Sequence, residues 1–150
     1  MTWDRVTKAI AGITGGAAGL LGGWSMLLTI LAWFMGIDYF SGLIVAWRGR
    51  SPKTEGGGVS SRVGFDGLIR KAFIMLVVLM ATLLDRAIGN SASVFQTAAT
   101  TYYIANEGIS ILENTSLMGV KYPAFIRKAL EALREQGDQG GEADARGEGR

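Results

Sequence analysis

The chain has 150 residues, of which 49% are hydrophobic, and a formal net charge of +2. It contains no cysteine and no histidine, which excludes disulfides and thiolate metal sites and removes the commonest general base and metal ligand. We therefore do not expect enzymatic chemistry, although carboxylates alone can support catalysis. The length is enough for one domain.

The charges are segregated along the chain rather than scattered. No charged side chain occurs from Ala9 to Ile37. This run is longer than the about 20 apolar residues that span the hydrocarbon core of a bilayer. This pattern predicts an all-α polytopic membrane protein. The expected fold has about four membrane-associated helices in two hairpins, followed by a short amphipathic helix and a disordered tail.

The first predicted helix, over residues 9–22, is thin and rich in glycine. Gly12, Gly16, Gly19 and Gly23 are spaced four or three residues apart, an arrangement that lets helices approach closely in lipid. Few large apolar groups are available here, so the sequence leaves open whether the segment crosses the bilayer, is partly inserted or lies along its surface. Cleavage as a signal peptide is disfavoured, because the apolar region continues to Ile37.

The second predicted helix covers residues 24–47 and has tryptophans at both ends, as suits the two membrane interfaces. Its 24 residues would make about 36 Å, enough to span with some tilt. Asp38 interrupts its apolar run.

A basic, glycine-containing loop over residues 48–62 leads to a third helix over residues 63–88, with Ser60 or Ser61 as its N-cap. Arg70-Lys71 and Asp85-Arg86 bracket the uncharged centre of this helix. Asp85 and Arg86 point to different helix faces, and a solvated role near the external end is favoured for both.

The fourth predicted helix, over residues 93–118, carries a polar stripe. Spacings of four, three, four, three and four residues separate its members, which are Gln96, Thr100, Tyr103, Glu107, Ser110 and Asn114. This is the helical period, so these groups share one face. An ionisable group such as Glu107 is expensive at bilayer depth and normally faces protein or water. Either a satisfied polar seam inside a helix bundle or a water-lined path fits the stripe.

After Gly119 and Pro123, residues 124–135 predict a short amphipathic helix, which completes a membrane helix bundle over residues 1–135. Residues 136–150 are rich in glycine and in charged residues of both signs, a composition that predicts a disordered tail.

Basic residues cluster before the first helix, between the second and third helices, and after the fourth. The turns at 22–23 and 89–91 contain none. All three basic regions are therefore predicted on the cytoplasmic side, which places both termini inside the cell. Membrane lipid is the expected partner of the helices. We expect no nucleic-acid partner, because the basic loop lacks aromatic side chains for stacking.

The two-hairpin arrangement places charges of three helices at one depth. Asp38 would lie about 21 Å from the start of its helix and Glu107 also about 21 Å from the start of its own. Arg70 and Lys71 would reach a similar level from the other side. We therefore predict a charged intramembrane layer in which Arg70 or Lys71 offsets the desolvation of the two carboxylates.

Several short segments together resemble the toxin-secretion/phage-lysis holin family, over roughly residues 24–133. They are Asp38-Tyr39-Phe40-Ser41-Gly42, residues 60–67, Arg70-Lys71, Asp85-Arg86, residues 103–114, Gly119 and Pro123. The glycine-rich loop and the charged tail show no such resemblance.

The resemblance implies a small phage-encoded protein of the bacterial cytoplasmic membrane. Such proteins form homo-oligomers, permeabilise the membrane and release an endolysin that lyses the host, and relatives near clostridial toxin genes are associated with toxin secretion. The family has no cofactor and no catalytic residues to transfer. The alternatives are a small ion channel or transporter subunit using Asp38 and Glu107, a toxin-export membrane protein, and a scaffold that anchors a partner.

Overall fold

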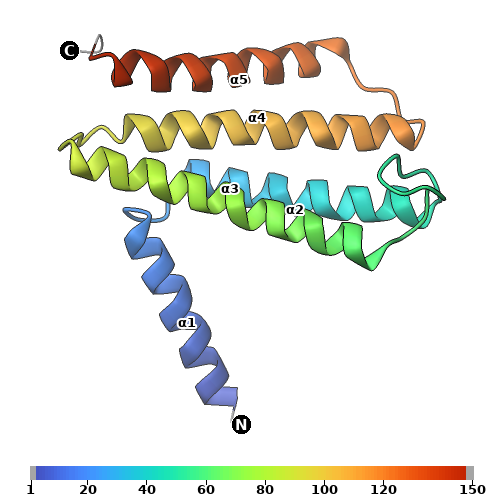
Figure 1. The fold of residues 1–150 in the computed structure, drawn as a ribbon, viewed down its shortest axis with the longest axis horizontal. Coiled ribbons are helices and arrows are strands. Elements are labelled where there is room, and N and C mark those ends of the chain that lie inside the picture. Colours follow the sequence, from blue (N-terminus) through green and yellow to red (C-terminus); the bar gives the residue numbers. More distant parts are fainter. Residues whose placement is uncertain (1–2, 148–150) are drawn as a thin grey trace.

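The structure is a computed structural model that describes residues 3–147, and those residues form five helices and no strand. The helices are α1 (Trp3–Leu20), α2 (Met26–Trp47), α3 (Ser61–Ala87), α4 (Val94–Leu117) and α5 (Ala124–Ala145). The predicted all-helical class is confirmed for this part of the chain. Four helices lie side by side along one direction, while α1 projects away from them (Figure 1).

The helix α4 is the centre of the bundle. It packs against α2 and α3 on one side and against α5 on the other, whereas α2 and α3 contact each other much less. The α5 helix therefore forms an outer layer beyond α4 (Figure 1). This order places α4 between two different neighbouring surfaces.

Serine side chains cap two of the helices. Ser25 is extended and its hydroxyl accepts a hydrogen bond from the Leu28 backbone amide, so α2 begins at Met26 rather than at Trp24. Ser60 caps α3 in the same way through the backbone amide of Val63. The positions of these two serines thus set where the helices begin.

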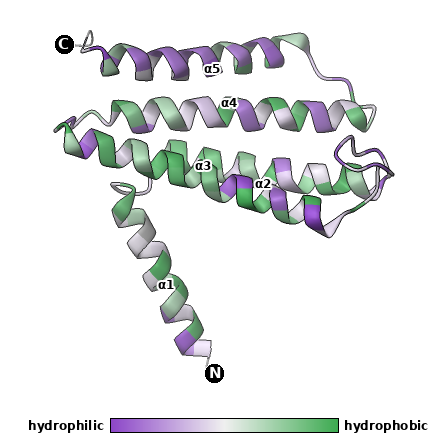
Figure 2. Cartoon of the chain, viewed as in Figure 1, coloured by the Kyte–Doolittle hydropathy of each residue, from purple (hydrophilic) through white to green (hydrophobic). Residues whose placement is uncertain are grey.

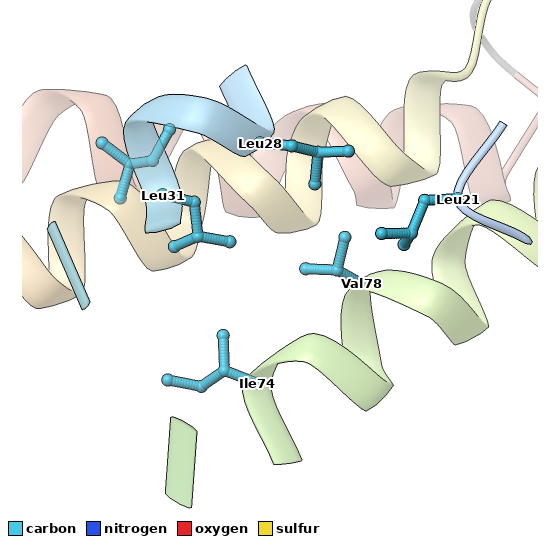
Figure 3. Close-up of a cluster of buried hydrophobic side chains, with 6 residues drawn as sticks. Leu21, Leu28, Leu31, Ile74 and Val78 are labelled. Carbon is cyan, nitrogen blue, oxygen red and sulfur yellow. The ribbon is translucent and has the colours of Figure 1, made fainter. Parts of the chain in front are cut away.

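The hydrophobic core is small and joins α2, α3 and α4. Its buried members are Leu21, Leu28, Leu31, Ile74, Val78 and Ile104. Figure 3 shows the leucines of α2 facing Ile74 and Val78 of α3, with Leu21 at the end of the cluster. The side chain of Leu21 enters this core although α1 itself leaves the bundle.

The outer surfaces of α2 and α3 remain strongly apolar. Large side chains such as Trp33 and Phe40 on α2, and Phe73, Leu76 and Met80 on α3, are exposed. Both helices are long and apolar enough to cross a membrane. Within residues 3–147, α1 and α4 do not meet that criterion, because the 18 residues of the first include Asp4, Arg5 and Lys8 and the polar stripe lowers the hydropathy of the second. The prediction of four membrane helices is thus not confirmed.

The helix α1 begins at Trp3, well before the predicted start. A Cβ atom added at Gly12, Gly16, Gly19 or Gly23 would meet nothing within 4 Å in the described chain. The packing role of these glycines therefore stays a prediction. The end of α1 is nevertheless attached, because Arg86 donates a hydrogen bond to the Gly19 carbonyl at 2.9 Å.

The helix α5 corrects the expectation of a disordered tail for the first ten of residues 136–150, while residues 148–150 lie outside the described part of the chain. It continues to Ala145, and Gly137 is buried against α4. A Cβ at position 137 would lie 2.7 Å from the Tyr102 nitrogen and 2.8 Å from the Ala98 oxygen. Composition suggests flexibility here, but the glycine permits a close approach of two helices, and that contact supports the helical continuation.

Candidate functional site

The centre of the candidate site is Lys71, which lies between two carboxylates inside the bundle. Its ammonium group donates a hydrogen bond to Asp38 Oδ2 at 2.8 Å and a second one to Glu107 Oε2. The exposed fractions are 9% for Lys71, 4% for Asp38 and 0% for Glu107. One residue from each of α2, α3 and α4 therefore meets in a buried charged layer.

Arg70 occupies a different position from its neighbour in sequence. Its guanidinium lies 3.9 Å from Asp38 Oδ2, but 54% of its side chain is exposed. Successive residues on a helix point in different directions, so only Lys71 enters the bundle fully. With all four groups ionised, two cations balance two carboxylates.

The layer is a costly arrangement rather than a simple source of stability. Among the described residues, Glu107 Oε1 is buried and finds no hydrogen-bond donor. Taking ions out of water costs several kcal/mol each, and the mutual attraction repays this only where the remaining hydrogen bonds are satisfied. The consequence is that removal of Lys71 would leave two buried carboxylates without their shared cation, whereas removal of one carboxylate leaves Lys71 paired with the other.

Asn114 of α4, about two helical turns after Glu107, contacts Asp38 and the nearby Ser41 of α2. Its side-chain amide donates to Ser41 Oγ at 2.9 Å and lies 3.3 Å from Asp38 Oδ1. A Cβ at Gly42 would be 3.6 Å from the same amide nitrogen, so the glycine lies directly beside this contact. The sequence pattern assigns no role in the charged layer to Ser41, although its spacing of three from Asp38 places both on one helix face.

The polar stripe of α4 faces α2 and α3. Its six residues are all buried or half-buried. Gln96 donates to the Leu21 carbonyl at 2.7 Å, Thr100 donates to the Gln96 carbonyl at 2.7 Å, and Tyr103 packs against the hydrophobic core. Within one copy of the chain, the stripe thus packs against its neighbours, while its members Ser110 and Asn114 also line a cavity.

A cavity of about 570 Å³ extends from the loop after α2 to the charged layer. Its lining includes Lys53 of the loop, Arg70, Ser110 of the stripe, and both Asp38 and Lys71. Water or a small ion in this cavity would have access to Arg70 and to the buried Asp38–Lys71 pair. The cavity therefore connects the charged layer to one end of the bundle through a lining that includes polar side chains.

Asp85 forms a second buried polar site at the opposite end. Its carboxylate accepts hydrogen bonds from the backbone amides of Phe95 at 3.1 Å and Gln96 at 2.9 Å. The favoured solvated role is wrong for this residue, which is 2% exposed and caps α4 from a neighbouring helix. Ser93 makes no side-chain cap bond itself. A carboxylate near a helix N-terminus is favourable, but the sequence does not show that the turn before α4 brings Asp85 to that position.

Residues 15–135 match the bacteriophage holin family. The chain is 37% identical to an uncharacterized protein of Clostridium perfringens strain 13, over 78% of this chain and 82% of the relative. It is 36% identical to one of Halalkalibacterium halodurans, over 87% and 96% of the two chains. A probable holin of Bacillus phage phi105 is 37% identical over 72% of this chain and 74% of its own. No solved structure matches significantly.

Proposed function

We propose that this chain, which belongs to the bacteriophage holin family, oligomerises in the bacterial cytoplasmic membrane and permeabilises it. The enzyme released through the membrane would be an endolysin that degrades the cell wall, and the host cell would then lyse. No catalytic step is part of this proposal. A named probable holin among the relatives supports the same role.

The observation that carries the proposal is the charged layer inside a bundle with apolar outer faces. The exposed side chains of α2 and α3 suit lipid, while Lys71 is paired with Asp38 and Glu107 in the interior. Such a bundle can collect in the membrane without exposing charge from its centre. The predicted orientation, with two hairpins and with the N-terminus and the basic loop after α2 in the cytoplasm, belongs to this proposal. Because α5 runs back along α4, its end lies beside Asn90, at the opposite end of the bundle from that loop, so the proposal does not keep the predicted cytoplasmic C-terminus.

Inducible expression in bacteria tests the function directly. The full chain is expressed together with a cytoplasmic muralytic enzyme that lacks an export signal. When both proteins are expressed, we expect sudden growth arrest followed by lysis. When either protein is expressed without the other, we expect no lysis. Continued growth of cells whose membranes contain the chain, with the enzyme retained inside, would refute the proposal.

The layer itself is tested with Glu107→Leu. This change leaves Lys71 with one carboxylate instead of two, and we expect permeabilisation to be impaired while membrane insertion is preserved. The matched control is Glu55→Leu, because Glu55 is exposed in the loop. Unchanged lysis timing for Glu107→Leu, with a normal amount of protein in the membrane fraction, would exclude a role for the layer.

A second candidate function is a small cation channel or transporter subunit. The cavity that reaches Asp38 and Lys71 favours it, since an ion could approach a carboxylate there. Saturable and selective ion flux without release of folded protein would support this candidate over the first. Toxin export is the remaining variant, and the same release assay with a large folded passenger addresses it.

A further inference from the structure

The helix α5 lies along α4 over nearly the whole length of that helix. Its 22 residues make about 33 Å. Near its start, Arg127 lies 4.0 Å from Glu113 of α4, and near its end Asp144 accepts a hydrogen bond from Asn90 at 3.0 Å. Any depth of membrane that α4 occupies is therefore also occupied by α5.

The two faces of α5 differ completely. The inner face, with Leu130, Leu133 and Gly137, packs on α4. The outer face has no exposed large hydrophobic side chain after Phe125. Its exposed residues are Lys128, Ala129, Ala132, Arg134, Glu135, Gln136, Asp138, Gln139, Glu142, Ala143, Ala145 and Arg146. Figure 2 shows the hydrophilic character of α5 against the hydrophobic α2 and α3.

The bundle is therefore amphipathic across its width. One side, formed by α2 and α3, exposes side chains such as Trp33 and Phe73, and the side formed by α5 exposes charges of both signs. An ionised side chain facing lipid at the bilayer centre costs at least about 2.5–3.5 kcal/mol on insertion scales. A docked α5 consequently needs water beside it at the same depth at which α2 and α3 need lipid.

We propose that the outer face of α5 lines a water-filled passage enclosed by several copies of this chain, with α2 and α3 turned outward to lipid. This inference rests on the proposed function and names the surface that forms the hole. A ring of copies satisfies both sides of the bundle at once. The passage wall then has three basic and three acidic side chains per copy, namely Lys128, Arg134, Arg146, Glu135, Asp138 and Glu142.

The equal number of basic and acidic side chains on the wall affects which molecules can move through the passage. A wall with interspersed charges of both signs attracts neither cations nor anions strongly, and ionised side chains keep the passage hydrated. Such a wall suits the passage of whole folded molecules of either charge. In the same assembly the polar stripe of α4 stays packed against α2 and α3.

Cysteine labelling tests the inference, because the natural chain contains no cysteine. Ala132→Cys and Ala143→Cys place a thiol on the outer face of α5, while Ala72→Cys places one on the exposed face of α3. The purified full-length variants are inserted into vesicles of phosphatidylethanolamine and phosphatidylglycerol that contain calcein. Release is compared before and after reaction with a polyethylene-glycol maleimide.

Labelling at either α5 position should slow calcein release several-fold relative to the unlabelled sample of the same variant. The Ala72→Cys variant should resist the water-borne reagent and release calcein at an unchanged rate. Full labelling of α5 with unchanged release, or no labelling of α5 in vesicles that do leak, would overturn the inference. Absence of release from the cysteine-free chain would instead overturn the proposed function, so the two failures are distinguishable.

Discussion

The helix α4 meets its neighbours through two unlike faces. Toward α2 and α3 it presents the polar stripe, and Glu107 there shares Lys71 with Asp38. Toward α5 it presents a close contact with the backbone of Gly137 and packs Gly108 against Leu130. Charge pairing determines the contact with α2 and α3, and close steric fit determines the contact with α5. Charge makes the first contact expensive to break, whereas the second can be loosened by a single methyl group.

The largest effect is expected from Lys71→Met. The change leaves two buried carboxylates without their shared cation, a loss that costs about 3–5 kcal/mol in the free energy of unfolding. Unfolding in detergent followed by tryptophan fluorescence measures it. The double variant Lys71→Met/Glu107→Gln should recover a large part of the loss, because one carboxylate then remains beside Arg70. Equal stability of the single and double variants would contradict charge as the organising force.

The opposite face of α4 is tested by a matched glycine pair. Gly137→Ala places a Cβ 2.7 Å from a backbone nitrogen that cannot move aside, so we expect a loss of about 1–3 kcal/mol in the docking of α5. Gly140→Ala should cost nothing, because its Cβ would meet the Ala98 Cβ at an ordinary 3.9 Å. Hydrogen exchange of the α5 amides distinguishes the two. Equal protection in both variants would show that shape does not control this contact.

A smaller effect is expected at the start of α4. Asp85→Ala removes the acceptor of two backbone amides and should cost about 1 kcal/mol, with the first turn of α4 exchanging faster. The control is Asp66→Ala on the same helix, where the carboxylate is exposed. A stability of the Asp85 variant equal to that of the Asp66 variant would exclude capping across the turn.

The smallest effect concerns the link between α4 and α5. Arg127 donates a hydrogen bond to Tyr122 Oη at 3.3 Å and thereby lowers the pKa of that phenol below its usual value. Since the folded-state pKa is lowered, the contribution to stability is present at alkaline pH and is lost as the pH falls through that pKa. Arg127→Gln should shift one tyrosine transition in an ultraviolet absorbance titration to higher pH. Arg134→Gln should leave it in place, and a shift in both variants would refute the contact.

The helical class could be predicted because hydrophobic period and charge segregation are local properties. The end of α5 could not be predicted, because Gly137 is explained by a contact with Tyr102 and Ala98, far away in the sequence. Long-range contacts also explain the polarity of α4. Its polar stripe lowers the hydropathy of the helix, although three neighbouring helices pack around it.

Helical rise places Asp38, Lys71 and Glu107 at one depth, and the structure brings these three together. Depth alone says nothing about rotation around a helix axis, so the exposure of Arg70 could not be foreseen. The buried role of Asp85 depends on the path of the turn before α4, which sequence spacing does not contain. Rotation and turn geometry are therefore the missing information.

The sharing of Lys71 also imposes an order on biosynthesis. Lys71 follows Asp38 by 33 residues, and Glu107 follows Lys71 by another 36. When the ribosome has completed α2 and α3, these two helices already contain the Asp38–Lys71 pair. The second carboxylate arrives only with α4 and finds its cation in position. In the proposed membrane role, Glu107 would therefore enter the bilayer only after its counter-ion.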